Sequence, residues 1–335
     1  MRKVNVLGID LAKNVFQLHG LDLQGNVVLK KKLRRGQLTA FIANLQPCLI
    51  GIEACSGSHY WARVFSQYGH KVKIMAPQYV KPYVKTNKND MADAEAIAEA
   101  VTRKNMRFVP LKTIASHDLQ SLHRARKRLV RNITALSNEV RGLLTEYGHV
   151  FPVGKKAFKQ NVIRILKSDS LSNSFQKTLQ DLYSEYLDLN LRLDEYNKRI
   201  SKECQENPVC QKLLKVKGIG ELTATALATV HPHVFKNGRE FAAWLGLTPR
   251  QFSSGSKDRL LGISKRGDGY IRQLLVHGSR VSLHWSSRKN DHLSIWASKL
   301  KDRRGYNKAT VALANKLARI CWAVMKYEKD FTLSY

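Results

Sequence analysis

The sequence predicts an α/β domain at the N-terminus, a helical coiled-coil linker in the middle and a mainly helical domain at the C-terminus. In residues 1–105, short apolar runs alternate with helical patterns, which is typical of an α/β layer. In residues 106–205, apolar residues recur at three- and four-residue spacing over two long segments. In residues 206–335, short helical patterns alternate with glycine turns. We place the domain boundaries at these three ranges.

The N-terminal elements follow one another closely. Three strands are predicted, in VNVLGID, NVFQLHGLD and GNVVLKKKLRR. A helix in QLTAFIANL, a strand in CLIGIEA, a helix in SHYWARVFSQYG and a strand in KVKIMAP come next, and the alanine-rich helix NDMADAEAIAEAVTRK closes the domain. The basic run Lys30 to Arg35 is either a charged edge strand, which discourages aggregation, or an RNA contact.

Two apolar stripes define the middle of the chain. They predict long helices that form an antiparallel coiled-coil arm or a dimer seam, with an ordinary helical bundle as the alternative. The segment GHVFPVGKKAF separates the two helices. The stripes comprise Leu122, Leu129, Ile133, Leu136, Val140 and Leu143, then Leu179, Leu182, Tyr186, Leu189, Leu193, Tyr196 and Ile200.

The C-terminal part begins with CQKLLKVKGIGELTATALATV, which predicts a helix, a tight turn and a second helix. This resembles a helix-hairpin-helix element, whose turn amides can hold a DNA phosphate, although a plain helical hairpin fits as well. REFAAWLGLTP predicts a helix that Pro249 stops, and Asp268 is a candidate N-cap for GYIRQLLVHGSRVSL. A last long helix is predicted through KATVALANKLARICWAVMKY.

The net charge of the chain indicates what kind of partner the protein binds. The chain of 335 residues carries a formal net charge of +31, with +9 in residues 1–105 and the rest beyond them. A body this basic attracts polyanions, and nucleic acid is the first candidate. We expect no membrane partner, because no apolar run approaches the roughly 20 residues needed to span a bilayer and no signal peptide is recognisable. The five scattered cysteines form no CxxC pair and indicate neither a zinc site nor a disulfide framework, so a cytoplasmic protein is expected.

Four carboxylates occupy positions that suggest a site. Asp10 ends the first predicted strand, Glu53 ends the run LIGIE, and Asp90 and Asp93 share one face at the start of the alanine-rich helix. Carboxylates brought together repel one another unless a cation joins them, and oxygen ligands of this type suit Mg²⁺. Two strand-end acids and a helix-borne pair form the pattern of RNase H-like nucleases and transposases.

Two alternatives compete with the metal site. Asp90 could instead be a helix N-cap. An actin-like ATPase also opens with a strand and GID, but it needs glycine-rich phosphate loops, and VGKKAF is not a P-loop.

Basic residues elsewhere suggest contacts with phosphate. HRARKRLVR distributes five cations around a long helix whose buried side holds Leu122 and Leu129, and we expect them to meet RNA rather than DNA. A lysine beside Val216 in KVKGIG is a further candidate for a phosphate contact. The glycine-containing loop QFSSGSKDRL and the residues that follow it add four cations that can neutralise a phosphate. Trp285, Trp296 and Trp322 are expected in the core. The helix cations are Arg124, Arg126, Lys127, Arg128 and Arg131, and the loop cations are Lys257, Arg259, Lys265 and Arg266.

Several stretches together resemble a known family. GIDLAKNVF, GIEACSGSHYWAR, KTNKNDMADAEAIAEA, LLKVKGIGELTA, FAAWLGLTPRQFSSGSKDRLLGISKRGDGYIRQLLVHGSR and ALANKLARICWAVM occur in order over nearly the whole chain. They resemble the DEDD transposases of bacterial insertion sequences, the IS one-ten group, which are related to the Piv DNA invertases. The resemblance implies a RuvC-like N-terminal domain, a coiled-coil linker and a C-terminal transposase domain with a nucleophilic serine. It also implies a structured bridge RNA and a homo-oligomer, a dimer or tetramer at the nucleoid, that holds double-stranded donor and target DNA.

The resemblance also assigns roles. Asp10, Glu53, Asp90 and Asp93 would be catalytic and would hold Mg²⁺, and the serine directly before Gly255 in PRQFSSG, Ser254, would attack the phosphate, with Ser253 as the second choice. The function expected is that of an RNA-guided, Mg²⁺-dependent transposase that works through a phosphoserine. One alternative is a metal-only RNase H-like nuclease or transposase without a covalent intermediate. The other is a basic nucleic-acid-binding protein whose acid cluster is inactive.

Overall fold

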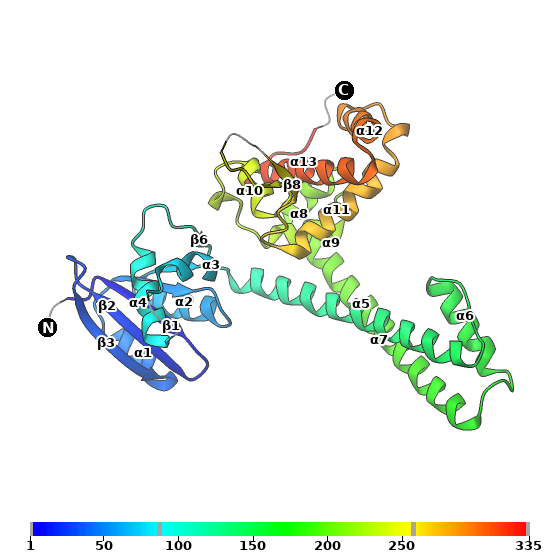
Figure 1. The fold of residues 1–335 in the computed structure, drawn as a ribbon, viewed down its shortest axis with the longest axis horizontal. Helices are drawn as coiled ribbons and strands as arrows, with labels where there is room; N and C mark the ends of the chain where they lie inside the picture. The colour runs from blue at the N-terminus through cyan, green and yellow to red at the C-terminus, as the bar shows by residue number, and fades with distance from the viewer. Residues whose placement is uncertain (1–2, 86–88, 256–258, 333–335) are drawn as a thin grey trace. The chain divides into compact units, whose positions relative to one another are not determined.

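The computed structural model describes residues 3–85, 89–255 and 259–332. The chain divides into two compact units, residues 1–113 and 114–335 (Figure 1). The first unit mixes strands and helices, and the second is mainly helical, as the sequence predicted.

The first unit is built on one sheet in the strand order β3-β2-β1-β4-β5-β6. β1, β4 and β5 are parallel, whereas β2, β3 and β6 each run antiparallel to their neighbour. The three opening strands and the two later ones confirm the sequence prediction, and β6 is an addition to it. The basic run on β3 is an edge strand, as one of its two interpretations required. The bounds are β1 Val6–Leu11, β2 Val15–Leu21, β3 Val27–Arg34, β4 Leu49–Glu53, β5 Lys71–Met75 and β6 Phe108–Val109.

Helices cover both faces of this sheet. α1 (Arg35–Ala43) and α2 (Ser58–Gln67) share an apolar core with one face, in which Phe16 and Phe65 are fully buried. α4 (Asp90–Val101) covers the other face and contacts β1, β2 and β4. The short α3 (Pro77–Val80) and a 3₁₀ turn at Lys81–Tyr83 lead toward α4.

Two glycines allow α4 to lie directly on the sheet. Gly8 of β1 pairs in register with Gly51 of β4. A Cβ on Gly8 would lie 2.2 Å from the carbonyl oxygen of Ala94, and one on Gly51 would lie 2.8 Å from Cβ of Val101. The absence of side chains at both positions therefore fixes how closely the helix approaches the strands.

We expect Gly8→Ala to destabilise the first unit. The added methyl group would meet the α4 backbone, which cannot rotate away as a flexible side chain can, so overpacking should cost about 1–3 kcal/mol or more. Urea unfolding would measure this loss. Gly36→Ala is the matched control, because nothing lies within 4 Å of a Cβ there, and equal effects of the two substitutions would contradict the packing argument.

The second unit begins with a helical arm. α5 (Ile114–Glu146) and α7 (Asn173–Glu206) pack antiparallel within the chain, since Arg126 meets Asn197 at one end and Tyr147 stacks on Phe175 at the other. The two long helices that the stripes predict are therefore present and antiparallel within the chain.

Two details of the arm differ from the sequence prediction. α6 (Lys155–Leu166) occupies part of the segment expected to be a linker, because Phe158, Val162 and Ile165 pack into the arm's core. Leu143, expected on the buried stripe, is exposed, and Leu144 is buried in its place. The stripe shifts by one residue because the last turn of α5 follows the straight-helix repeat of 3.6 residues rather than a repeat of 3.5.

The remaining helices surround α13 and share one apolar core. Asp268 caps α11 by accepting hydrogen bonds from the amides of Tyr270 and Ile271, as predicted. α10 ends at Trp244 rather than at Pro249, because Gly246 takes a left-handed conformation (φ 72°) and turns the chain. The bounds are α8 Pro208–Leu214, α9 Glu221–Ala228, α10 Gly238–Trp244, α11 Gly269–His284, α12 His292–Arg304 and α13 Tyr306–Tyr327.

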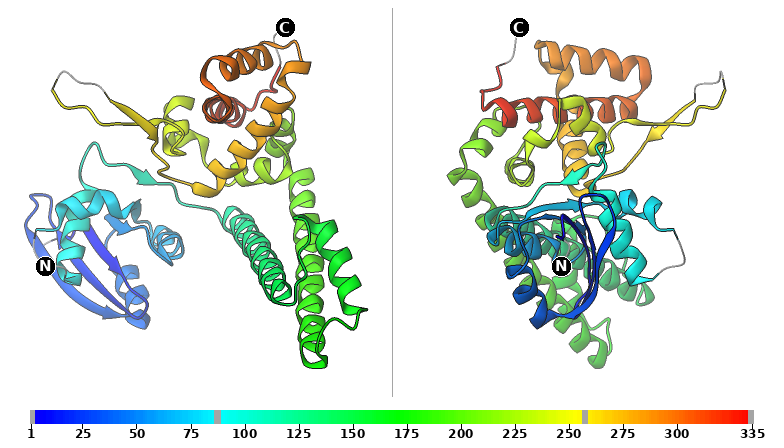
Figure 2. Two further views of the ribbon diagram at one scale, coloured as in Figure 1. Left: turned by 45° about the vertical axis from the view of Figure 1, so that its right-hand side comes forward. Right: turned by 90° about the vertical axis from the view of Figure 1, so that its left-hand side faces the viewer.

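A two-stranded hairpin interrupts these helices. β7 (Pro249–Gln251) and β8 (Leu260–Ile263) pair antiparallel and extend away from the helices of this unit (Figure 2). The sequence suggested only a polar loop here. The hairpin was missed because its strands are short and exposed on both sides, so they carry no alternation of apolar and polar residues.

Other expectations concern single residue types. Trp322 is buried and Trp296 packs against the core, but Trp285 is 43 % exposed with the Arg288 guanidinium over its ring, so its core assignment was wrong. It lies at the end of α11, where the helix leaves the core.

All five cysteines are free thiols. In the part of the chain that the structure describes, no helix is long and apolar enough to cross a membrane.

Candidate metal centre and serine hairpin

Because side chains alternate between the two faces along a strand, two of the acids lie on the same face of the sheet. Side chains two residues apart on a strand point to the same face, so Asp10 shares a face with Gly8, and Glu53 shares one with Gly51. That face is the one that α4 covers, because α4 meets both glycines. Both acids lie at the carboxyl ends of parallel neighbours, next to the pair Ile9 and Ile52 in the register.

The N-terminal turn of α4 brings the other two acids to the same place. One oxygen from each of Asp10, Asp90 and Asp93 lies within 4.8 Å of the other two, and the group could hold a metal ion. Asp10 and Asp93 are half-buried and Asp90 is exposed. Asp10 is therefore less enclosed than its place at the end of an apolar strand suggested, because it stands where the strand leaves the core.

Asp90 is not the N-cap of its helix. The cap is Asn89, whose side chain accepts a hydrogen bond from the amide of Met91 at 3.0 Å. Asp90 is the first helical residue, so its carboxylate is available to the cluster. Ile97 and Val101 of the same helix are buried, and Glu95 and Glu99 pair with Lys85 away from the cluster.

Glu53 belongs to the same electrostatic environment, although it is not among the three acids that meet within 4.8 Å. Burial raises the pKa of its carboxyl group, and the charges of Asp10 and Asp93 raise it further. All three influences oppose ionisation of Glu53. Burial and the charges of Asp10 and Glu53 likewise raise the pKa of the nearby Cys55 thiol.

The residues present fit a divalent cation. Hard oxygen ligands from several carboxylates suit Mg²⁺, which is commonly held by one or two protein carboxylates together with water and substrate phosphate. A cation there would also relieve the repulsion that raises the pKa of Glu53.

We expect Glu53→Gln to raise the melting temperature in EDTA by an amount on the order of a few degrees. The folded state raises the pKa of Glu53, so the folded state binds the proton more tightly than the unfolded state does, and stability falls as pH rises through the folded pKa. The gain should therefore be present at neutral pH and disappear near pH 4. Saturating Mg²⁺ should stabilise the wild type more than the variant. Differential scanning fluorimetry measures both, and a variant that melts below wild type in EDTA at neutral pH would contradict this account.

Ser254 lies at the distal part of the hairpin, exposed to solvent. Gln251 donates a side-chain hydrogen bond to the Ser253 hydroxyl at 3.0 Å, and the Phe252 amide donates to the Arg259 carbonyl across the hairpin at 2.9 Å. Arg259 is exposed beside it, and Lys257 lies outside the described residues. The Ser253 hydroxyl thus has a partner on the strand that precedes it.

The base of the hairpin is tied to α10 and α11. The Lys265 amide donates to the Gly246 carbonyl at 3.1 Å, and Lys265 itself has a positive φ of 54°. The Arg272 guanidinium donates to the carbonyls of Leu245 and Arg266 at 2.9 and 2.7 Å. A Cβ on Gly267 would lie 1.8 Å from the Trp244 carbonyl oxygen. These contacts hold Lys265 and Arg266, both exposed, at a fixed place below the serine.

The cations of the basic helix α5 fall into two groups, those that are exposed to solvent and those that contact residues of other helices. Arg124, Arg128 and Arg131 are exposed. Arg126 instead donates to the side chain of Asn197 at 2.7 Å, and the Lys127 ammonium lies 5.3 Å from the centre of the Tyr270 ring. The sequence could not show this division, because both partners come from distant helices.

A buried histidine beside these cations was not anticipated. His123 lies between the Tyr270 hydroxyl and the Thr225 hydroxyl, 3.1 Å from each, and so connects α5 with α9 and α11. Burial, and then the charge of Arg126, lower the pKa of His123 to about 4. The neutral ring is a structural junction of the second unit.

The lysines on either side of Val216 are occupied by carboxylates. Lys217 pairs with the buried Asp291, and Lys215 pairs with Asp330 at 2.6 Å. Gly218 packs against Gly278 of α11, where an added Cβ would lie 2.7 Å from the carbonyl oxygen. The predicted order of a helix, a tight turn and a second helix is confirmed by α8 and α9. The phosphate contact expected of a lysine beside Val216 stays a prediction.

Carboxylates at the ends of parallel strands, completed by a helix-borne pair, are typical of enzymes that use divalent metals on phosphodiesters. Family comparison gives the particular class. Residues 7–149 match the model of the DEDD transposases of IS110, and residues 210–293 match that of the transposase IS116/IS110/IS902 family.

Relatives match over almost the whole chain. A probable family 20 transposase of Pseudomonas aeruginosa is 44 % identical over 96 % of this chain and 97 % of its own length. The transposase for insertion sequence element IS1111A of Coxiella burnetii is 42 % identical over 99 % and 92 %, and that for IS1328 of Yersinia enterocolitica is 39 % identical over 97 % of both. The chain belongs to the IS110/IS116 family of insertion-sequence transposases.

Proposed function

We propose that this transposase cleaves and rejoins double-stranded donor and target DNA through a phosphoserine at Ser254, with Mg²⁺ held by Asp10, Glu53, Asp90 and Asp93 and with a structured bridge RNA as guide. The observation that carries the proposal is the convergence of the strand-borne Asp10 with the helix-borne Asp90 and Asp93, which supports an RNase H-like (RuvC-like) nuclease domain. A second support is the exposed Ser254 on a hairpin that carries cations.

The acids have a direct role in this proposal. Asp10, Asp90 and Asp93 present carboxylate oxygens close enough to share one cation, and Glu53 adds charge beside them. Mg²⁺ bound there would supply Lewis-acid stabilisation to the oxygens of a phosphodiester. The α4–sheet contact at Gly8 and Gly51 keeps the donors in place, which is the preorganisation that such a site requires.

The serine has the complementary role. Its Oγ forms a bond to phosphorus, the bond from phosphorus to one strand oxygen breaks, and that oxygen leaves with a proton. The phosphodiester energy is kept in the Ser254 linkage, so a second strand can reverse the step. Arg259, Lys265 and Arg266 would neutralise the charge on the phosphate, as would Lys257. The hairpin sequence has no histidine, so the base must come from outside it.

The partners follow from the same proposal. The exposed cations of α5, Arg124, Arg128 and Arg131, suit the phosphate backbone of the guide RNA. Two DNA sites must be held together, so a homo-oligomer, a dimer or tetramer, is expected, acting in the cytoplasm at the nucleoid.

A reconstituted reaction tests the guidance. Purified protein is incubated with labelled donor and target duplexes and Mg²⁺, with and without RNA transcribed from the flanks of its own element. Joined product that requires the matching RNA supports the proposal. Equal cleavage without RNA and without a protein–DNA adduct would favour the metal-only nuclease. Binding without Mg²⁺-dependent cleavage would favour a nucleic-acid-binding protein with an inactive acid cluster.

A further inference from the structure

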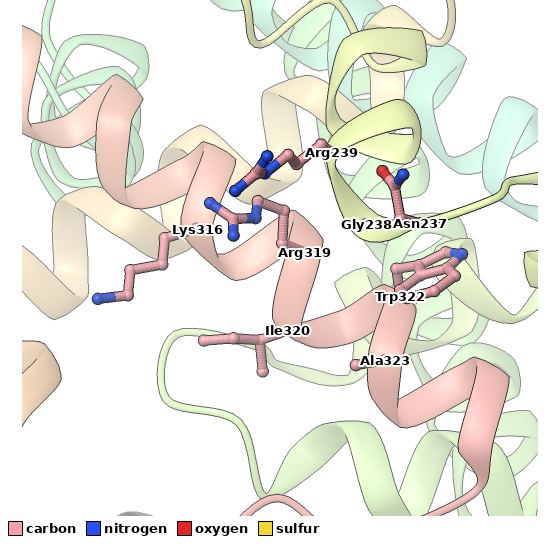
Figure 3. A pocket seen from close by; sticks show the side chains of 8 residues that line it. All are labelled: Asn237, Gly238, Arg239, Lys316, Arg319, Ile320, Trp322 and Ala323. Carbon is pink, nitrogen blue, oxygen red and sulfur yellow. The ribbon is translucent and has the colours of Figure 1, made fainter.

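A pocket of about 470 Å³, which no sequence pattern predicted, lies between the start of α10 and the middle of α13. Its wall carries three cations, Arg239 from α10 and Lys316 and Arg319 from α13, and its lining contains no acidic residue. Figure 3 shows the two guanidinium groups extending from different helices toward the same part of the pocket.

The fold forces these cations together. Gly238, directly before Arg239, is buried against α13, and a Cβ there would lie 3.1 Å from the Cα of Arg319. The two backbones therefore touch at the point where the arginines emerge. Lys316 and Arg319 stand three residues apart on α13, a spacing at which like charges repel.

The repulsion is not relieved by ion pairs in the described parts of the chain, where no carboxylate pairs with any of the three. Burial, and then the charge of Arg319, lower the pKa of the Lys316 ammonium. Its nitrogen lies 4.3 Å from the centre of the Trp296 ring, a contact that orients it without neutralising it. Clustered cations of this kind favour an anion.

The remaining lining suits a sugar beside the anion. Ile320, Ala323 and the ring of Trp322 make an apolar floor, while the Trp322 indole N–H is already donated to the Pro232 carbonyl at 3.0 Å. Asn237 also lines the pocket, and its side-chain oxygen accepts a hydrogen bond from the Glu240 amide at 3.0 Å. The volume lies in the range of pockets that hold a ligand of nucleotide size.

We propose that this pocket binds a phosphodiester of a nucleic acid backbone, with the phosphate between Arg239 and Arg319 and the adjoining sugar over Ile320 and Ala323. The proposal rests on the proposed function in taking nucleic acid as the polyanion, and it adds a contact remote in sequence from the acids and from the serine hairpin. DNA and RNA share the chemistry that the pocket recognises.

Salt-dependent binding tests the proposal. Full-length wild type, the double variant Arg239→Gln and Arg319→Gln, and the charge-matched control Lys301→Gln and Arg303→Gln on α12 are titrated against labelled duplex DNA and, separately, labelled flanking RNA. All four residues are exposed, so folding should survive, and thermal melting verifies this. We expect the pocket variant to bind one of the two nucleic acids roughly tenfold more weakly, with a log–log salt slope smaller by about one, because the two arginines together hold one phosphate. The control should change less.

A measurement on unmodified protein complements the variants. The lowered pKa of Lys316 leaves more of its neutral amine for an acylating reagent, and bound backbone should protect it. Mass spectrometry should show protection of Lys316 by the same nucleic acid that the double variant binds weakly, with exposed Lys177 on α7 as the reference.

The binding and protection measurements together decide whether the pocket holds DNA, RNA or neither. Weakening and protection with DNA alone assign the pocket to DNA, and with RNA alone to RNA. A pocket variant that binds both as the control does, without protection of Lys316, overturns the inference. Failure of the proposed phosphoserine chemistry is scored separately, as absence of a protein–DNA adduct with wild type, and does not affect the binding comparison.

Discussion

Ser254→Ala is expected to abolish the covalent attachment of cleaved DNA to the protein. The Ser254 hydroxyl is the group that would bond to phosphorus, and alanine has no nucleophilic atom to take its place. The measurement is a denaturing gel of end-labelled DNA after incubation with protein, RNA and Mg²⁺. Ser253→Ala is the matched control, since it removes a neighbouring hydroxyl that already accepts a hydrogen bond from Gln251.

The control variant should retain the adduct at a level within a few-fold of wild type. If Ser253→Ala removes the adduct and Ser254→Ala keeps it, the nucleophile is the other serine. If Ser254→Ala still cuts DNA and wild type forms no adduct, the enzyme is a metal-only nuclease that uses water or a DNA hydroxyl.

Asp93→Asn is expected to lower the rate of DNA cleavage by about 10³-fold, equivalent to about 4 kcal/mol of transition-state stabilisation. The change keeps the shape of the side chain and removes the charge that it brings to Asp10 and Asp90. Glu95→Gln is the matched control on the same helix, since Glu95 pairs with Lys85 away from the cluster. Initial rates over a Mg²⁺ series provide the comparison.

The metal dependence separates the possible causes. A ligand variant should need more Mg²⁺ or fail to reach the wild-type rate at any concentration, while Glu95→Gln should follow the wild-type curve. Equal losses in both variants, with lowered melting temperatures, would mean that Asp93 only supports the helix and would contradict a metal-binding role.

The strand part of the candidate site could be predicted because strand periodicity is local. Asp10 and Glu53 follow apolar runs, and the alternation along each strand determines which face their side chains occupy. The spacing of Asp90 and Asp93 likewise follows from the helix. The contact that unites them, α4 lying on Gly8 and Gly51, depends on non-local packing that no single segment reveals.

Other features escaped prediction for the same reason. The start of α6 falls in the segment predicted to be a linker, because nearby glycines and a proline obscure a short helix whose partners lie on α5 and α7. Lys217 looked available to phosphate until the fold brought Asp291 against it. The pocket of Arg239 and Arg319 requires two helices that are far apart in the sequence, and neither helix alone shows that its cations meet those of the other.

The most direct test of the central claim is to map the covalent linkage under conditions in which the acids are varied. Adduct from wild type is digested with nuclease and protease, and the modified peptide is sequenced by mass spectrometry, alongside identical reactions in EDTA and with Asp10→Asn. We predict a nucleotide remnant on Ser254 in wild type with Mg²⁺ and none in the other two reactions. A remnant on another residue, or one that persists at Ser254 in EDTA and with Asp10→Asn, would contradict the proposal that Ser254 reacts with phosphate only when the acids hold Mg²⁺.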